Sequence, residues 1–162
     1  MPATRILDIH DLLTSSTVKV GLPGATKEGV LNNLIDSFTG HPAVRDLEEV
    51  RKAIFEREQM MSTGVGKGLA LPHAKTPAVQ ESIAAFAATS WPIDFGSIDD
   101  QPVRLVFMLV GTESAKSEHI KILSRVSRLM NRDRFRTRLL DAKTSEEILS
   151  IFEDGETDLM EG

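Results

Sequence analysis

The sequence contains no cysteine, which excludes disulfide bonds, thiolate metal sites and any cysteine nucleophile. It also lacks an apolar run of the roughly 18 residues that a transmembrane helix needs, and its start, MPATRILDIHDLLTSS, has no signal-peptide core. Basic residues are not in excess either, because the formal net charge is -5, and this argues against a nucleic-acid partner. These absences predict a cytoplasmic chain with no membrane segment of its own.

What the sequence does contain is typical of one globular domain. Its 162 residues are 41% hydrophobic and 27% charged, and a domain of this length buries roughly 70% of the surface that its unfolded chain exposes. We expect a single domain over residues 1–162, with a core over about 5–153. The tail, residues 154–162, is acidic and is expected to fray.

The spacing of apolar residues predicts the order of the elements. Val18, Val20 and Leu22 alternate as in a strand, and Thr26 has the position of an N-cap residue for the helix that follows. The pattern also predicts a second helix to about residue 61, strands over 82–91 and 103–110, and C-terminal helices from Ser117, over 133–141 and after a Thr144–Glu147 capping box. The predicted fold class is α/β, with a short mixed sheet flanked by helices on both sides.

The segment Ser62-Thr63-Gly64-Val65-Gly66-Lys67-Gly68 is the most informative stretch. Glycines such as Gly64 and Gly66 let backbone N–H groups approach a ligand, and the hydroxyls of Ser62 and Thr63 with the Lys67 ammonium suit a phosphoryl group. The Pro72 ring stiffens the backbone ahead of His73. The loop therefore predicts an anion site that ends in a histidine.

Other interpretations of the glycines remain to be weighed. A Walker A loop needs Lys-Ser or Lys-Thr, whereas Lys67 precedes Gly68, and a dinucleotide fingerprint must open a helix, whereas this loop runs into Leu-Pro-His. A tight surface turn explains the same glycines and stays open as an alternative.

The four histidines separate by context. His10 and His41 lie in the N-terminal segment and in a helix-stop turn, and no His pair has zinc-ligand spacing, so we expect no metal. The first helical turn favours a neutral imidazole at His119, whose role the pattern leaves open between structural and functional. A neutral imidazole has one lone pair that can attack phosphorus, so the residues predict a phosphohistidine at His73.

The run STGVGKGLALPHAK, residues 62–75, closely resembles the signature of the enzyme IIA domains of the bacterial phosphotransferase system, of the fructose/mannitol and nitrogen-regulatory type. Arg57-Glu58, Ile93-Asp94-Phe95-Gly96 and Glu118-His119-Ile120 resemble further parts of the same family. The resemblance extends from about Leu7 to Phe152. It implies the enzyme IIA mannitol/fructose-type fold.

The resemblance also implies roles. His73 would carry the phosphoryl group, His119 would support it, Arg57 would line the site, and Ser62 and Thr63 would flank the phosphate pocket. The donor would be the phosphocarrier protein HPr or its nitrogen-branch relative, and the acceptor a IIB cysteine. Alternatively, the phosphorylation state would act as a signal on regulatory protein targets. The transfer would need no metal or organic cofactor.

Three functions stay open at this point. We favour a nitrogen-regulatory IIA over a fructose/mannitol transport component, and a binding module without catalysis is the alternative of a different class. A set of basic residues from Lys121 to Arg138 indicates either a solvated helix face or a docking surface.

Overall fold

The computed structural model describes residues 8–161, and the side chains of residues 8–159. The elements follow one another as α1 (Ile9–Leu12), β1 (Val18–Leu22), α2 (Lys27–Asp36), α3 (Leu47–Met60), β2 (Gly64–Gly66), β3 (Leu69–Ala70), β4 (His73–Lys75), β5 (Ile83–Ile93), β6 (Val103–Gly111), α4 (Lys116–Met130), α5 (Asp133–Asp141) and α6 (Ser145–Glu161). Among these helices, none is both long and apolar enough to cross a membrane.

The sheet is mixed, as predicted, and has six strands: five follow the order β1-β5-β6-β3-β2, and the sixth, β4, also pairs with β6. The two long central strands are antiparallel, with Ile83 opposite Val110 at one end. Strand β1 is parallel to β5, while β3 and β4 are both parallel to β6 and follow one another along its edge. Between β3 and β4 the Pro72 carbonyl accepts a 2.9 Å hydrogen bond from the Leu109 N–H, so the backbone stays against β6 up to His73.

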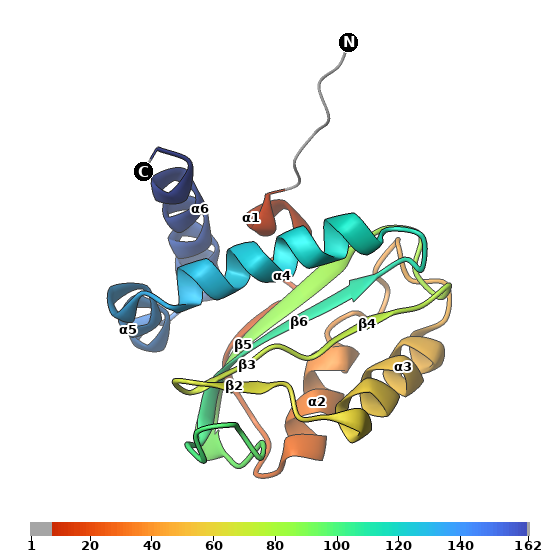
Figure 1. Cartoon of the computed structure of the whole chain (residues 1–162), viewed down its shortest axis with the longest axis horizontal. Coiled ribbons are helices and arrows are strands. Elements are labelled where there is room, and N and C mark those ends of the chain that lie inside the picture. The colour runs from red at the N-terminus through yellow and green to blue at the C-terminus, as the bar shows by residue number, and fades with distance from the viewer. Residues whose placement is uncertain (1–7, 162) are drawn as a thin grey trace.

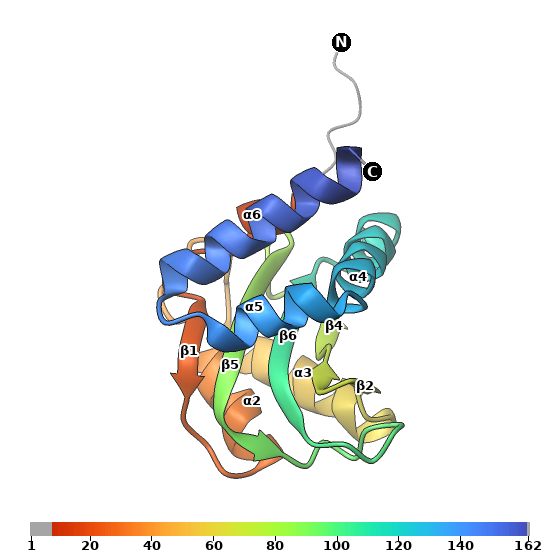
Figure 2. The ribbon, with the colours of Figure 1, turned by 90° about the vertical axis from the view of Figure 1, so that its left-hand side faces the viewer.

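Helices cover both faces of the sheet (Figures 1 and 2). Because side chains alternate along a strand, β6 sends Phe107 to the core under α1, α4, α5 and α6, and Met108 to the core under α2 and α3. The ring of Phe152 from α6 packs within 5.3 Å of Phe86 and 5.9 Å of Phe107, measured between ring centroids. The predicted α/β class with helices on both sides is confirmed.

Three of the predicted helix starts, after Thr26, at Asp133 and after Thr144, are confirmed, and the one at Ser117 is wrong. The Thr26 and Thr144 hydroxyls accept from the N–H groups of Gly29 and Glu147 at 3.0 and 3.1 Å, as N-cap residues do. Helix α4, however, begins at Lys116, and its N-cap residue is Ala115, which offers no capping side chain. Ser117 therefore lies inside the helix.

The acidic tail is helical rather than frayed, which corrects the sequence prediction. Helix α6 continues to Glu161 because Glu156 is buried and accepts hydrogen bonds from the backbone N–H groups of Ile9 and His10, at 2.7 and 2.9 Å. The Arg125 guanidinium of α4 lies 3.3 Å from the same carboxylate. One side chain thus connects α1, α4 and α6, and the packed part of the chain extends past residue 153.

The basic residues of α4 and α5 are partly used within the fold. Arg125 pairs with Glu156, Arg136 with Asp133, and Arg138 with Asp154. These pairs favour the interpretation of a solvated, ion-paired helix surface over a free basic stripe.

Candidate active site

His73 is held in one tautomer by its own backbone. It opens β4, where it lies opposite Leu109 of β6, and its ring Nδ1 is 2.7 Å from the Leu71 carbonyl oxygen. A carbonyl oxygen only accepts, so Nδ1 carries the proton and donates it, and Nε2 keeps its lone pair. The ring is half-buried and has a free nucleophilic nitrogen.

The environment of His73 keeps its imidazole neutral. Burial lowers the pKa of His73, the hydrogen bond to the Leu71 carbonyl opposes this, and the positive charges of Arg57 and Lys75 lower the pKa further. A neutral ring is the form that can attack phosphorus. The same two cations would stabilise the negative charge of a phosphoryl group.

His119, in the first turn of α4, faces His73. The two ring centroids are 5.5 Å apart, with the ring planes inclined by 53°. The His119 side chain is buried, and neither ring nitrogen has a hydrogen-bond partner among the residues that the structure describes. Buried polar atoms are normally bonded, so these two nitrogens are available to a group that enters the site.

Gly111, the last residue of β6, gives the His119 ring its place, and the sequence analysis did not identify it. A Cβ at this position would lie 2.9 Å from His119 Nδ1, closer than real Cβ contacts. Any side chain would therefore push the imidazole away from the end of the strand. In the sequence, the signal that could have identified Gly111 was its position directly after the apolar run 103–110.

The two histidines line a cavity of about 500 Å³ between α3, β4 and α4. Arg57 and Lys75 also line it, and Met60 and Ile120 lie at its margin with 80% and 66% of their surfaces exposed. Arg57 is oriented by a 3.0 Å hydrogen bond from its guanidinium to the Met61 carbonyl. Exposed apolar side chains around a polar cavity are typical of a docking surface for another protein.

The structure places Ser62 and Thr63 beside this cavity's helix but not on its wall. The Ser62 hydroxyl donates to the Phe95 carbonyl at 2.6 Å, and the Thr63 hydroxyl donates to the buried carboxylate of Glu58. Glu58 also pairs with Lys27 at 2.7 Å. Each hydroxyl donates its proton to a group of the protein itself, so both stabilise the turn between α3 and β2.

The glycine segment forms a β-hairpin, β2–β3, with Lys67 and Gly68 at its tip in left-handed conformations (φ 58° and 76°). A Cβ on Gly64 would lie 2.3 Å from the Ser97 hydroxyl oxygen, and Gly66 has φ 99° beside Asp99. Packing and turn geometry therefore account for these glycines. None of Gly64, Gly66 and Lys67 lies on the wall of the His73 cavity as the structure describes it, and the Lys67 ammonium bonds Asn131 instead.

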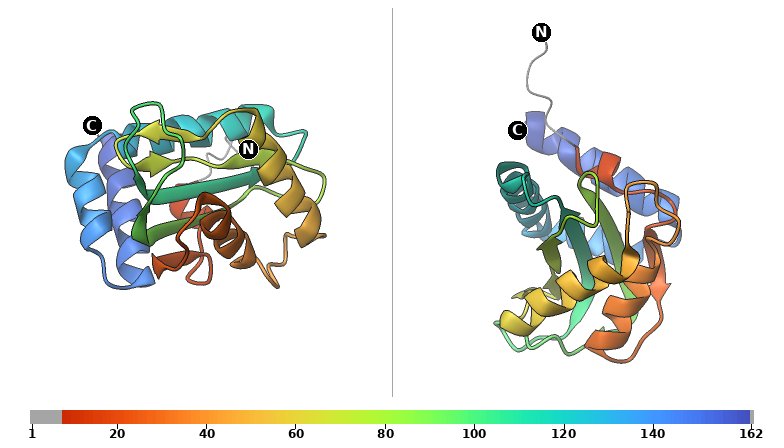
Figure 3. Two further views of the ribbon diagram at one scale, coloured as in Figure 1. Left: turned by 90° about the horizontal axis from the view of Figure 1, so that it is seen from below. Right: turned by 90° about the vertical axis from the view of Figure 1, so that its right-hand side faces the viewer.

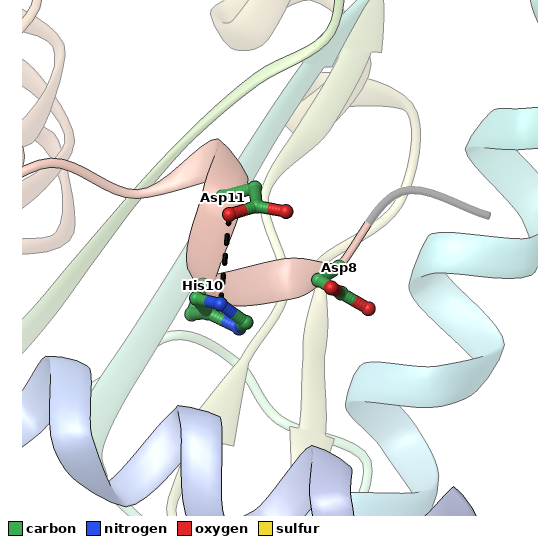
Figure 4. Close-up of side chains that lie close together, drawn as sticks. All are labelled: Asp8, His10 and Asp11. Atoms are coloured by element: carbon green, nitrogen blue, oxygen red, sulfur yellow. Dashed lines mark ion pairs between the residues drawn. The ribbon is translucent and has the colours of Figure 1, made fainter. Parts of the chain in front are cut away.

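A second cluster of potential ligands lies on α1. The ligand atoms of Asp8, His10 and Asp11 are within 4.8 Å of one another, and His10 Nε2 is 3.5 Å from Asp11 (Figure 4). His10 Nδ1 is 3.0 Å from the Glu156 carboxylate. This is the group of three among the described residues that could hold a cation, and it shares no residue with the His73 cavity.

Titration of His119 is expected to differ from that of an ordinary histidine. Burial lowers its pKa from 6.5 to about 4, with contributions from the charges of His73 and Lys75. Between these two values the unfolded chain binds more protons than the folded one, so the free energy of unfolding rises with pH from about 4 to 6.5. We expect the ring resonances of His119 to titrate near pH 4, and the pH dependence of stability in this window to be weaker in His119→Gln. A midpoint near 6.5 would contradict this.

The chain is similar to known proteins over most of its length. A family model described as "Phosphoenolpyruvate-dependent sugar phosphotransferase system, EIIA 2" matches residues 11–155. The chain belongs to this family. The resemblance inferred from residues 62–75 and from the Glu118-His119-Ile120 segment is confirmed, and this EIIA chain is a component of the phosphotransferase system.

Relatives of this EIIA chain carry both transport and regulatory names. It is 37% identical to the "PTS system fructose-specific EIIABC component" of Bacillus subtilis, covering 90% of this chain but only 23% of that protein. It is also 37% identical to the "Nitrogen regulatory protein" of Bradyrhizobium diazoefficiens, covering 90% of this chain and 94% of that one. The names thus support both branches of the family.

Solved structures confirm the fold. The nitrogen regulatory protein IIA-Ntr from Neisseria meningitidis superposes with a TM-score of 0.83 at 27% identity, over 89% of this chain and 98% of that chain. Mannitol IIA from Escherichia coli superposes with a TM-score of 0.73 at 22% identity, over 86% and 97%. The predicted mannitol/fructose-type IIA fold is therefore correct.

Proposed function

We propose that this EIIA chain is a phosphoryl carrier that works through a phosphohistidine at His73. One observation carries the proposal: the Leu71 carbonyl accepts from Nδ1 at 2.7 Å and leaves Nε2 as the nucleophile in a cavity shared with His119. Phosphoryl transfer asks a protein mainly for positioning and charge stabilisation. The cavity offers a fixed nucleophile and two nearby cations.

The transfer step follows from these contacts. The lone pair of His73 Nε2 forms a bond to phosphorus, while the bond between phosphorus and the donor's nitrogen breaks and its electron pair returns to the donor's imidazole. The His73 ring then carries a positive charge that its Nδ1–H shares with the Leu71 carbonyl. Arg57 and Lys75 stabilise the phosphoryl oxygens, and the neutral His119 ring donates its one N–H to them.

The partners follow from the family. The donor is an HPr-type phosphocarrier protein or its nitrogen-branch relative, and the margin around Met60 and Ile120 is where it docks.

We favour a regulatory role, in which the phosphorylation state controls protein targets, in line with the nitrogen regulatory relative that matches over 94% of its length. The alternative is delivery to a IIB cysteine in sugar transport, which the fructose-specific relatives at 37% and 34% identity support. A binding module without transfer is disfavoured because both histidines line one cavity.

An in vitro relay tests this function. The chain is incubated with phosphoenolpyruvate, enzyme I and an HPr-type protein, and its intact mass is measured before and after a fructose-type IIB is added. We expect one added phosphoryl group, stable in base and labile in acid. Onward transfer to the IIB cysteine indicates the transport role, whereas a label that stays on the chain favours regulation. No label with either HPr or its nitrogen-branch relative would contradict the carrier function.

A further inference from the structure

The orientation of the His119 ring depends on the helix that carries it, because neither ring nitrogen has a hydrogen-bond partner among the residues that the structure describes. His119 lies in the first turn of α4, where its backbone N–H donates to the Ala115 carbonyl at 3.0 Å. Ala115 is the N-cap residue and offers no capping side chain. The place of the ring is therefore set by other contacts that hold this first turn.

One such contact joins the first turn of α4 to the sheet. The Ser82 hydroxyl donates to the Glu118 carboxylate at 2.6 Å. Ser82 is buried and directly precedes β5, and Glu118 directly precedes His119. The start of β5, the end of β6 and the start of α4 meet at the end of the sheet that faces the viewer in Figure 3 (right). The hydrogen bond thus connects the sheet to the helical turn that carries the second histidine of the cavity.

Ser82 and His119 also pack around a common point at Gly111. A Cβ on Gly111 would lie 2.9 Å from His119 Nδ1 and 3.5 Å from the Ser82 hydroxyl oxygen. Gly111 follows Val110, which is opposite Ile83 at the start of β5. The register of the two central strands therefore brings the Ser82 hydroxyl to the place where the imidazole packs, and its bond to α4 holds the helix there.

A different role for Glu118 has to be distinguished from this one. A negative charge in the first turn stabilises a helix through its dipole, and Glu118 has this position in α4. That role needs the charge but no particular partner. A hydrogen bond needs an acceptor oxygen, and without it the buried Ser82 hydroxyl would lose its partner. The two roles therefore predict different effects of Glu118→Gln, which removes the charge and keeps an acceptor.

We propose that the hydrogen bond between Ser82 and Glu118 positions His119, by holding the first turn of α4 where the His119 ring faces His73. The two ring centroids are 5.5 Å apart, and misplacement of a catalytic group by about 1 Å can cost on the order of 10²-fold in rate. Ser82 and Glu118 are positioning residues, since neither is among the described residues that line the His73 cavity. The inference rests on the proposed carrier function and adds two residues to it.

The test measures phosphoryl transfer from phosphorylated HPr to the full chain by rapid quench, over a range of HPr concentrations. We expect Ser82→Ala and Glu118→Ala each to lower the maximal rate about tenfold, without changing the HPr concentration that gives half of it. Because both remove the same bond, the double variant should lose no more than either one. Glu118→Gln should keep most of the rate, because its amide oxygen accepts. The matched controls, Glu113→Ala and Ser117→Ala at exposed positions, should leave the rate unchanged.

A second readout reports the geometry without phosphoryl transfer. In the unphosphorylated chain, we expect a nuclear Overhauser effect between the ring protons of His73 and His119, whose rings lie side by side. It should weaken in Ser82→Ala and in Glu118→Ala, and persist in Glu118→Gln. Thermal unfolding of each variant controls for the fold.

Three results would overturn the proposal. They are additive losses of rate in the double variant, an equal loss in Glu118→Gln and Glu118→Ala, and a nuclear Overhauser effect that stays unchanged in both alanine variants. The second of these would assign Glu118 to the charge at the helix start. If the wild type took up no phosphoryl group, the carrier function would fail instead, and the nuclear Overhauser effect would still decide the positioning of His119.

Discussion

Replacement of His73 by asparagine is expected to abolish phosphoryl uptake from an HPr-type donor. The variant loses the Nε2 lone pair that attacks phosphorus. Among the described side chains that line the cavity, the other imidazole beside Arg57 and Lys75 is that of His119, which is buried. Intact mass after incubation with phosphoenolpyruvate, enzyme I and HPr measures the effect. We expect no added phosphate.

The matched control is His41→Asn. The His41 ring Nδ1 accepts a 3.1 Å hydrogen bond from the N–H of Ala43, two residues on, and an asparagine oxygen can accept at the same spacing. This variant should be labelled like the wild type. Full labelling of His73→Asn would move the phosphorylation site to another residue.

Replacement of His119 by alanine is expected to slow transfer without preventing it. Its buried ring lies 5.5 Å from that of His73, and its pKa of about 4 keeps it neutral at pH 7 with one N–H to donate. A donor aimed at charge that develops in the transition state is worth about 10²-fold in rate or more. Rapid quench with labelled phosphate, in both directions between HPr and this chain, should show that loss.

His119→Gln separates a hydrogen-bonding role from a packing role. Glutamine keeps an N–H donor but not the ring, so we expect it to recover part of the rate that alanine loses. Thermal unfolding of both variants controls for the loss of packing at a buried position. Wild-type rates in His119→Ala would mean that His119 is structural.

Local signals predicted most elements and singled out His73 as the candidate nucleophile, whereas the role of His119 was implied only by the family resemblance. Alternation at Val18–Leu22, the caps at Thr26 and Thr144, and the apolar runs that became β5 and β6 depend on neighbours in sequence, and the structure agrees with each. The placement of His73 by the Pro72 segment is local in the same way. Where one stretch of backbone determines the geometry, its residues are sufficient to predict it.

The sequence alone was insufficient where contacts between distant residues determine the structure. The glycines at 64 and 66 suit a phosphate loop and a tight hairpin equally, and only contacts with Ser97 and Asp99 distinguish the two. The acidic tail lacks a strong local reason to be helical, and Glu156 becomes buried because it caps α1 from the far end of the chain. A glycine is likewise required at position 111 because the His119 ring packs against it.

The identity of the phosphorylated nitrogen tests the mechanism most directly. NMR correlation between ³¹P and ring ¹⁵N in the phosphorylated, histidine-labelled chain shows which atom carries the phosphoryl group. Because the Leu71 carbonyl occupies the Nδ1–H of His73 at 2.7 Å, we predict coupling of phosphorus to Nε2 of His73 alone. Coupling to Nδ1, or to a ring nitrogen of any other histidine, would contradict the proposed mechanism.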